Sequence, residues 1–374
     1  MHKHYLTKAV KEKIAIILTE QFTYKYYLSH IVENSNKNFI ILGNFSIKDK
    51  KDEYTDTDRV KFVNIGVNRK KMHLSDFLVF FKILRTLKIN KVDKVITIMP
   101  KTNVLGQIAA KLLAIKTSIT ISTGNLWLSR KGISRIFLLY MERFVIMLCD
   151  IMVADSKSQY ELLKKFHPNL KNKIRFVMGL KSRDFNKVSS IDKSKDKIVI
   201  GHIGLLNKRK GTDEAIEIAK KCFSNDLTLN FRFIGVVDES KILDSLKDLK
   251  LSYPKKIVFK NGLFDFEKEV SKIDILLMPS QWEGFGIAAV EAAKLKKIVI
   301  GYDVIGLKDS IIKNKTGHRV KYKNQNAIIK LLKMYSEDHY MLRKMQNLSY
   351  KISREKFKSS NMTANLKKAL EVIN

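Results

Sequence analysis

One stretch of the chain reads Pro279-Ser280-Gln281-Trp282-Glu283-Gly284-Phe285-Gly286-Ile287-Ala288-Ala289-Val290-Glu291-Ala292-Ala293. The apolar run before it, residues 273–278, predicts a strand, and the alanine-rich run after the glycines predicts a helix. The turn between them therefore presents backbone N–H groups and a helix N-terminus at the carboxyl end of a strand, where α/β sheets bind anions. In a continuous helix, Glu283 and Glu291 would lie on one side, about 12 Å apart.

A second segment has the same form. Residues 197–206 read Lys-Ile-Val-Ile-Gly-His-Ile-Gly-Leu-Leu and predict a strand that ends in glycines, among them Gly204. A basic loop with Arg209 and Lys210 follows, and Thr212 then begins a capped helix. A strand, a basic glycine-containing loop and a helix N-terminus together predict a pyrophosphate site. The plain alternatives are a solvated loop here and, for the two glutamates, acids that complement a helix dipole.

The Glu-Gly-Phe-Gly turn, with its second glutamate eight residues after the first, resembles the donor-site signature of glycosyltransferase family 4. The resemblance implies a GT-B fold, in which two Rossmann-like, doubly wound α/β domains face each other across a cleft. It also implies retaining transfer from a nucleotide-sugar: Glu283 contacts the transferring sugar, Glu291 holds the ribose hydroxyls and Lys210 neutralises the departing diphosphate. The remaining donor-site residues that we predict are Gly204, Arg209, Gly284, Phe285, Gly286 and Ile287.

The phosphate loop departs from the family pattern at Leu205, where the family usually has an arginine. An arginine would offer phosphate a bidentate and permanently charged partner, whereas leucine offers none. Lys208 or Arg209 is the candidate to replace it. A binding or scaffold subunit that kept the fold without full activity is therefore the alternative to an enzyme.

The expected N-terminal wall of the cleft follows the strand at residues 117–121. Members of this branch often carry His-Thr-Gly-Gln-Val-Trp there and Lys-Gly shortly afterwards, which the chain matches with residues 123–127 and 131–132. Ser122 replaces the histidine, and a serine can donate a hydrogen bond but cannot carry charge. Trp127 is either a core residue or a platform for an acceptor. The predicted acceptor side of the cleft consists of Ser122, Thr123, Gly124, Asn125 and Trp127.

Strand and helix patterns alternate in both halves of the chain, which predicts mostly parallel sheets. We expect an N-terminal acceptor-binding domain at residues 1–180, a linker at 181–196 and a nucleotide-sugar-binding domain at 197–350. The resemblance implies that residues 351–374 form a helix that crosses back to brace the first domain. At 374 residues, each domain is long enough to bury its own core.

The net charge of +34 raises the possibility of a nucleic-acid or membrane partner, but it is spread evenly over the two halves. No nucleic-acid-binding motif supports the first partner, so we expect none. Residues 94–147 hold eight basic residues, one acid (Glu142) and many apolar residues, which suits an anionic membrane surface. The most apolar run, residues 136–154, is interrupted by charges and predicts a buried or interfacial helix instead of a membrane span.

These features favour a glycosyltransferase of bacterial surface polysaccharide synthesis that acts on a glycan or lipid-linked oligosaccharide. Its donor would be a UDP- or GDP-linked sugar, and the resemblance implies no bound metal or other cofactor. Two distant cysteines and the absence of a signal peptide indicate a cytoplasmic protein, which we expect to lie peripherally on the cytosolic face of the inner membrane.

Overall fold

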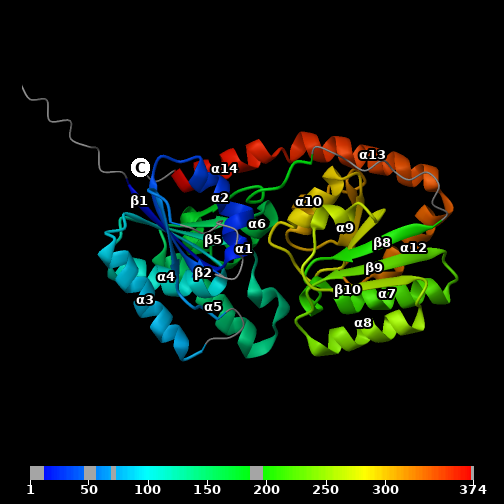
Figure 1. The fold of residues 1–374 in the computed structure, drawn as a ribbon, viewed down its shortest axis with the longest axis horizontal. Helices are drawn as coiled ribbons and strands as arrows, with labels where there is room; N and C mark the ends of the chain where they lie inside the picture. Colours follow the sequence, from blue (N-terminus) through cyan, green and yellow to red (C-terminus); the bar gives the residue numbers. More distant parts are fainter. Residues whose placement is uncertain (1–11, 46–55, 69–72, 186–196, 372–374) are drawn as a thin grey trace, which may run out of the picture.

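The computed structural model describes residues 12–45, 56–68, 73–185 and 197–371. The chain forms two parallel β-sheets with helices on both faces, and the sheets lie side by side along the long axis of the molecule (Figure 1). Most strand residues are buried, as is typical of parallel strands that are covered on both faces. The predicted architecture of two doubly wound α/β domains is confirmed.

The first sheet has the order β3-β2-β1-β4-β5-β6-β7. Its strands are β1 (Lys13–Glu20), β2 (Asn38–Asn44), β3 (Val60–Asn64), β4 (Lys94–Ile98), β5 (Thr117–Ser122), β6 (Ile151–Ala154) and β7 (Ile174–Phe176). Its helices are α1 (Gln21–Thr23), η1 (Tyr24–Leu28), α2 (Ser29–Glu33), α3 (Ser75–Ile89), α4 (Pro100–Leu112), η2 (Leu126–Ser129), α5 (Gly132–Leu148), α6 (Lys157–Phe166) and η3 (Pro168–Lys173). On one face, Ile83 of α3 and Ala109 of α4 pack against Ile17 of β1.

The second sheet has the order β10-β9-β8-β11-β12-β13. Its strands are β8 (Ile198–Ile203), β9 (Leu229–Gly235), β10 (Ile257–Asn261), β11 (Ile275–Met278), β12 (Ile298–Tyr302) and β13 (Gly317–Val320). The helices are η4 (Lys208–Lys210), α7 (Thr212–Ser224), α8 (Ser240–Ser252), α9 (Phe266–Val270), α10 (Ile287–Lys294), α11 (Leu307–Ser310), α12 (Gln325–Glu337), α13 (His339–Lys356) and α14 (Ser359–Glu371). The strand order reverses between β8 and β11, and in doubly wound sheets ligands bind beside the carboxyl ends of the strands at such a point.

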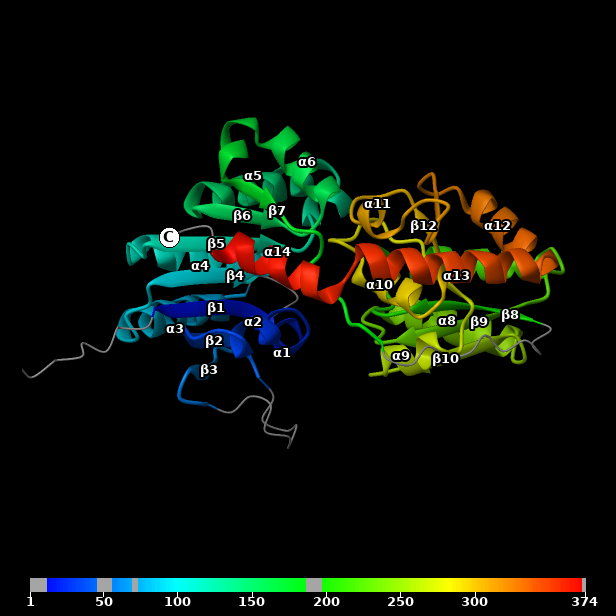
Figure 2. The ribbon, with the colours of Figure 1, turned by 90° about the horizontal axis from the view of Figure 1, so that it is seen from above.

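The last two helices connect the domains. Helix α13 lies along the second domain, where Ser349 Oγ donates to Lys297 O at 2.9 Å, and α14 continues onto the first domain (Figure 2). Leu366 and Leu370 of α14 are buried against the first sheet, and Lys94 Nζ donates to Leu370 O at 3.2 Å. The predicted boundary at residue 350 falls within α13, and the chain crosses to the first domain only after Lys356.

The predicted linker, residues 181–196, is described only as far as Phe185; residues 186–196 lie outside the described residues. The described part is held by Lys294 of α10, whose Nζ donates to Ser182 Oγ at 2.8 Å and to Asp184 Oδ1 at 2.6 Å. Among the described helices, none combines the length and the apolar character that a membrane span requires.

Candidate active site

Two loops meet at the point where the strand order of the second sheet reverses. The loop after β8 contains η4, and the loop after β11 contains residues 279–286 and leads into α10. Gly211 lies in the left-handed region, with φ 73°, and a Cβ on it would lie 2.0 Å from Pro279 O. Only glycine therefore permits this close approach of the two loops. The predicted phosphate loop and the predicted donor turn are thus neighbours in space.

Glu283 is the centre of this loop pair. Its carboxylate accepts hydrogen bonds from Lys210 Nζ at 2.8 and 2.7 Å and from Ser280 Oγ at 2.8 Å, and the side chain is almost fully buried. Burial alone would raise the pKa of Glu283, but the charges of Lys210 and Arg209 outweigh it and hold the pKa below its ordinary value. The structure thus brings together the two residues predicted to be catalytic and keeps Glu283 ionised.

Arg209 lies on the same loop as Leu205 and brings a charge beside Glu283. Its guanidinium lies 4.8 Å from the centroid of the Trp282 ring, and its Nη1 is 3.9 Å from Glu283 Oε2. Lys208, the other candidate, is exposed, and its backbone N–H donates to Glu239 Oε1 at 2.9 Å. Of the two, Arg209 is therefore the residue that the fold places beside Glu283.

Glu291 has a different partner, Arg183. Its carboxylate accepts hydrogen bonds from the Arg183 backbone N–H at 2.9 Å, from Nε at 3.1 Å and from Nη2 at 2.8 Å. Helix α10 begins only at Ile287, so Glu283 lies on the turn before it and does not share a helix face with Glu291. The expectation of two carboxylates on one side of a continuous helix is wrong, because Gly286, with φ 81°, changes the chain direction between them.

The other predicted donor residues contribute mainly their backbone. Gly204 has φ 138°, and Gly235 packs so closely against it that a Cβ would lie 1.6 Å from Gly204 O. The Phe285 side chain packs into an apolar cluster with Phe357, which lies between α13 and α14; the two ring centroids are 5.9 Å apart. Gly284, Gly286 and Ile287 complete the turn and begin the helix, so the backbone of this turn is what a phosphate could contact.

The predicted acceptor wall forms one buried hydrogen-bonded group. Gln159 Nε2 of α6 donates to Ser122 Oγ at 3.0 Å and to Asn125 Oδ1 at 3.2 Å, and Asn125 Nδ2 donates to Glu142 Oε1 at 2.6 Å. Trp127 is 1% exposed, and its Nε1 donates to Glu142 Oε2 at 2.9 Å. Of the two alternatives for Trp127, the structure supports the core residue, because a buried ring cannot stack on an acceptor.

The two domains touch at this wall. A Cβ on Gly124 would lie 2.1 Å from the Trp282 ring, and a Cβ on Gly284 would lie 2.6 Å from Thr123 O. Next to this contact, the Gly306 N–H donates to Ser158 Oγ at 2.9 Å, and the Ser158 N–H donates to Asp309 Oδ2 at 3.0 Å. The acceptor wall and the donor turn therefore face each other in direct contact.

Sequence reasoning missed several residues of this site, among them Asp155, Gln159 and Arg183. Asp155 had a usable signal, since it directly follows the strand β6 and polar residues at carboxyl ends of parallel strands line the cleft. Arg183 had no such signal in the sequence, because its partner, Glu291, lies 108 residues further along the chain. Gln159 is hidden in an amphipathic helix and is visible only through its contacts.

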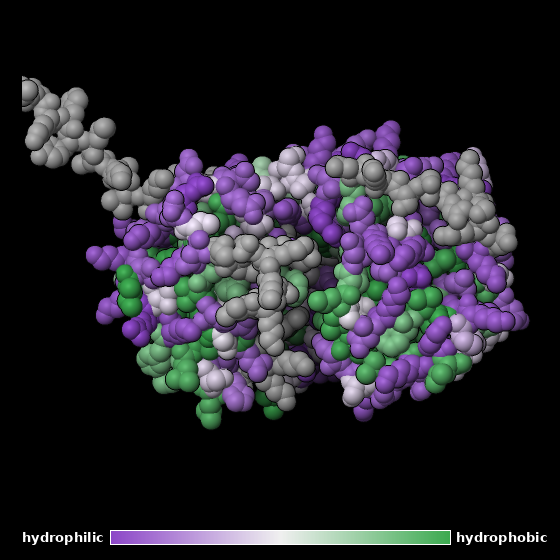
Figure 3. Space-filling model, in the orientation of Figure 1, coloured by the Kyte–Doolittle hydropathy of each residue, from purple (hydrophilic) through white to green (hydrophobic). Residues whose placement is uncertain are grey.

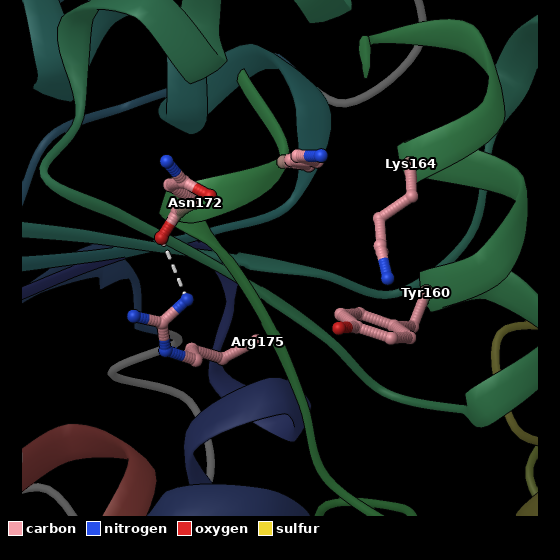
Figure 4. A pocket seen from close by; sticks show the side chains of 5 residues that line it. Tyr160, Lys164, Asn172 and Arg175 are labelled. Atoms are coloured by element: carbon pink, nitrogen blue, oxygen red, sulfur yellow. Dashed lines mark hydrogen bonds between the residues drawn. The ribbon is translucent and has the colours of Figure 1, made fainter. Parts of the chain in front are cut away.

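A separate hollow lies on the outer part of the first domain. This cavity of about 410 Å³ is lined by Tyr160, Lys164, Lys171, Asn172 and Arg175, whose side chains come from α6, η3 and β7 (Figure 4). Lys164 Nζ lies 4.8 Å from the Tyr160 ring centroid, and Arg175 Nη1 donates to Asn172 O at 2.6 Å. None of its lining residues is among the residues that contact Glu283, so this hollow is separate from the candidate active site.

Parts of this chain resemble known proteins in sequence. Residues 184–352 match the family model described as Glycosyl transferases group 1. The chain is 28% identical over 302 residues to an uncharacterized 41.2 kDa protein in the cps region of Klebsiella pneumoniae, covering 76% of this chain and 80% of that protein. It is 26% identical over 277 residues to CapM, a capsular polysaccharide biosynthesis glycosyltransferase of Staphylococcus aureus, covering 70% of this chain and 71% of the relative.

Solved structures share the fold over almost the whole chain. Sucrose-phosphate synthase from Thermosynechococcus elongatus has a TM-score of 0.76 at 14% identity and covers 97% of this chain and 99% of its own. Anabaena HepE, solved in complex with UDP and glucose, has a TM-score of 0.71 at 14% identity and covers 96% and 100%. The fold is therefore the two-domain GT-B architecture that the resemblance implied.

Proposed function

We propose that this chain, whose second half matches the group 1 glycosyl transferases, is a retaining glycosyltransferase of family 4 that uses a nucleotide-sugar. The observation that carries the proposal is the ion pair of Glu283 and Lys210 between two glycine-containing loops at the strand-order reversal. The HepE structure contains UDP and glucose, so a UDP-sugar is our first choice of donor and a GDP-sugar is the second.

In this proposal the diphosphate binds to the backbone of the turn and to the first turn of α10. Lys210 and Arg209 stabilise the charge that develops as the diphosphate leaves, which is the larger part of the rate enhancement in such sites. Glu283, held ionised by Lys210, orients the transferring sugar, and Glu291 holds the ribose hydroxyls while Arg183 keeps its carboxylate in position. The acceptor hydroxyl approaches from the wall formed by the first domain, on the face of the sugar that the diphosphate leaves.

The departing phosphate oxygen takes the proton of the acceptor hydroxyl, so no dedicated protein base and no metal ion is part of the proposal. This fits the acceptor wall, where Ser122 accepts a hydrogen bond from Gln159 and carries no charge. The arrangement of Lys210, Arg209 and Glu283 favours an enzyme over a scaffold subunit, because the arginine missing at position 205 is supplied from the loop itself.

We further propose that the acceptor is a glycan or lipid-linked oligosaccharide of capsule or O-antigen type, since CapM is a capsular polysaccharide glycosyltransferase.

The lipid-facing surface would be formed by the exposed apolar residues of α3 and α5 in the first domain. On α5, Ile133, Phe137 and Tyr140 are more than half exposed, as are Phe77 and Leu78 on α3. Apolar surface gathers over the lower part of the first domain, around α3 (Figure 3). Arg135 of α5 and Lys131 just before it are exposed basic residues, which suit anionic headgroups on the cytosolic face of the inner membrane.

The test of the proposed function is a thermal-shift screen over UDP, GDP and their sugars, followed by turnover of the compounds that bind. A ligand present at a hundred times its Kd stabilises the folded chain by about 2.7 kcal/mol, so a true donor raises the Tm clearly. Glu283→Ala should lower turnover at least tenfold while nucleotide binding persists. A chain that binds nucleotide normally but turns over no sugar would instead be a scaffold.

A further inference from the structure

Asp155 lies on the acceptor wall, opposite the donor turn. It follows β6 directly, and because Ala154 pairs with Ser122 of β5, Asp155 lies beside Thr123 at the carboxyl edge of the first sheet. A Cβ on Gly284 would lie 2.3 Å from Asp155 Oδ2. The carboxyl group of Asp155 therefore touches the residue next to Glu283 across the domain boundary.

One oxygen of the Asp155 carboxyl group is enclosed without a hydrogen-bond partner among the described residues. The residue is 5% exposed, and its Oδ1 is buried with no hydrogen-bond partner in the part of the chain that the structure describes. The backbone of Asp155 makes two hydrogen bonds: its N–H donates to Gln159 Oε1 at 3.0 Å, and its carbonyl accepts from Gly179 N at 2.8 Å. Leaving a buried acceptor unpaired destabilises the folded chain, so such atoms in native proteins call for an explanation.

The charges around Asp155 make its position more costly still. Across the domain boundary, the cations Lys210 and Arg209 pair with Glu283. Burial first, and then the like charges of Glu283 and Asp309, raise the pKa of Asp155 well above its ordinary value. The Glu283 carboxylate is thus paired with cations, whereas no ion pair joins Asp155 to a cation within the part of the chain that the structure describes.

We propose that Asp155 binds a hydroxyl group of the sugar held between the domains, so that the sugar is gripped by one carboxyl from each wall. Sugar hydroxyls supply O–H donors to a carboxyl oxygen without adding charge, which is the chemistry that this position lacks. Position 122 is a serine, which carries no charge and whose hydroxyl already accepts a hydrogen bond from Gln159. Asp155 therefore supplies the polar contact between the first domain and the sugar. This inference rests on the proposed function and names a further residue of the same site.

The hydroxyl can belong to the donor sugar or to the acceptor sugar, and two measurements on the full chain separate these sources. The variants are Asp155→Ala and Asp155→Asn, with Asp150→Asn as the matched control. Asp150 lies at the opposite end of β6, where it accepts from Ser118 N at 2.7 Å. In the donor measurement, calorimetry compares UDP with UDP-glucose. A donor hydroxyl predicts that Asp155→Ala weakens UDP-glucose binding about tenfold and leaves UDP binding unchanged.

In the acceptor measurement, transfer to octyl glucoside is followed with the nucleotide-sugar that the wild type uses fastest. An acceptor hydroxyl predicts that Asp155→Ala raises the KM for the glycoside about tenfold and leaves donor binding unchanged. Values within twofold of the wild type in both measurements overturn the inference, and so does an equal loss in Asp150→Asn. A wild type that binds no nucleotide refutes the proposed function itself, whereas normal UDP binding with an indifferent Asp155 refutes only this inference.

The pH dependence of stability checks the unpartnered carboxyl without any ligand. The folded chain binds the Asp155 proton more tightly than the unfolded chain, whose pKa is near the ordinary 3.8, so stability falls as the pH rises above this value. Asp155→Asn stays neutral at every pH. Its Tm should therefore match the wild type near pH 4 and exceed it by about 2–4 °C at pH 8. A wild type as stable as Asp155→Asn at pH 8 would show that the carboxyl has a partner, against the inference.

Discussion

Glu283 and Glu291 belong to one sequence motif but have unlike surroundings. Glu283 is bound by a lysine from the neighbouring loop, and Glu291 is bound by Arg183 from the segment that joins the domains. Each carboxylate is therefore held in position by a residue that lies far from it in the sequence. The partner, more than the spacing of eight residues, determines what each acid can do.

Arg183 should matter for nucleotide binding although it lies in a connecting segment. Arg183→Ala removes two of the three hydrogen bonds that orient Glu291, so we expect UDP affinity to fall about tenfold, which corresponds to about 1.4 kcal/mol. Arg183→Lys restores the charge without the bidentate geometry and should recover only part of the affinity. Calorimetry with UDP measures both. Tighter binding in Arg183→Ala would mean that Arg183 competes with the ribose.

At the scale of single residues, sequence reasoning assigned Glu283 and Lys210 to one site, and they lie in contact, because glycine-containing turns after strands leave a strong signal. It could not choose between Lys208 and Arg209, because the loop geometry decides which of them reaches Glu283. It left open whether Trp127 is a core residue or a platform for an acceptor, since the same sequence suits a buried or a surface ring, and the structure shows the buried ring. It also could not foresee Arg183 as the partner of Glu291, because long-range pairing depends on how the chain returns to the second domain.

Helix α5 shows how one element combines two roles. Its outward face carries exposed apolar residues such as Phe137, while Glu142 on its inner side binds η2 and α6. Glu142 accepts from Asn125 and Trp127, and His167 Nε2 lies 3.2 Å from Glu142 Oε2. The single acid of residues 94–147 is thus a structural anchor of the acceptor wall.

Glu142→Ala should destabilise the first domain by about 2–4 kcal/mol, because it leaves the Asn125 amide and the Trp127 indole N–H buried without an acceptor. Urea unfolding followed by tryptophan fluorescence measures this change. Glu161→Ala, on the exposed side of α6, is the control and should change stability by less than about 0.5 kcal/mol. Equal midpoints for Glu142→Ala and the wild type would contradict the anchoring role.

Helices and strands were predictable where the run of apolar residues is long, and less so where this run is short. Buried strands such as β1, β4 and β9 follow from apolar runs between polar loops. Strand β13, residues Gly317–Val320, was missed because four partly polar residues carry no periodicity. The helix expected at residues 351–374 is divided between the end of α13 and α14, because the chain breaks at Phe357, whose ring is buried against Phe285.

At the scale of the molecule, the C-terminal helix is part of the first domain although it follows the second in sequence. Leu366 and Leu370 complete the apolar face of the first sheet, next to residues of β1, β4 and β5. The core of the first domain is therefore complete only when α14 packs onto it. Stability of the first domain should accordingly depend on residues beyond 358.

Leu366→Ala tests this dependence. Leu366 is fully buried, and truncating a buried leucine costs about 2–5 kcal/mol, so the unfolding transition of the first domain should shift to lower urea. Lys368→Ala changes an exposed residue of the same helix and should leave the transition in place. Urea unfolding read by tryptophan fluorescence reports the shift. If Leu366→Ala and Lys368→Ala unfold alike, α14 does not brace the first domain.

Membrane binding is also a property of the whole molecule. We expect flotation of the protein with vesicles that contain anionic lipid, decreasing as salt rises, because screening weakens the attraction of the basic residues. The double variant Ile133→Ser with Phe137→Ser removes exposed apolar groups of α5 and should float several-fold less. Leu263→Ser removes an equally exposed leucine of the second domain and is the control. A protein that stays unbound at low salt would contradict the proposed membrane surface.

The two tryptophans report on different parts of the protein. Trp127 is sealed inside the first domain, whereas Trp282 belongs to the second domain and its ring lies against Gly124 of the first. If the domains move apart, water reaches the Trp282 indole while the surroundings of Trp127 stay the same. In a Trp127→Phe protein, Trp282 would therefore be the single source of tryptophan fluorescence. A red shift of its emission would then report the fraction of molecules in which the domains have separated, without an attached dye.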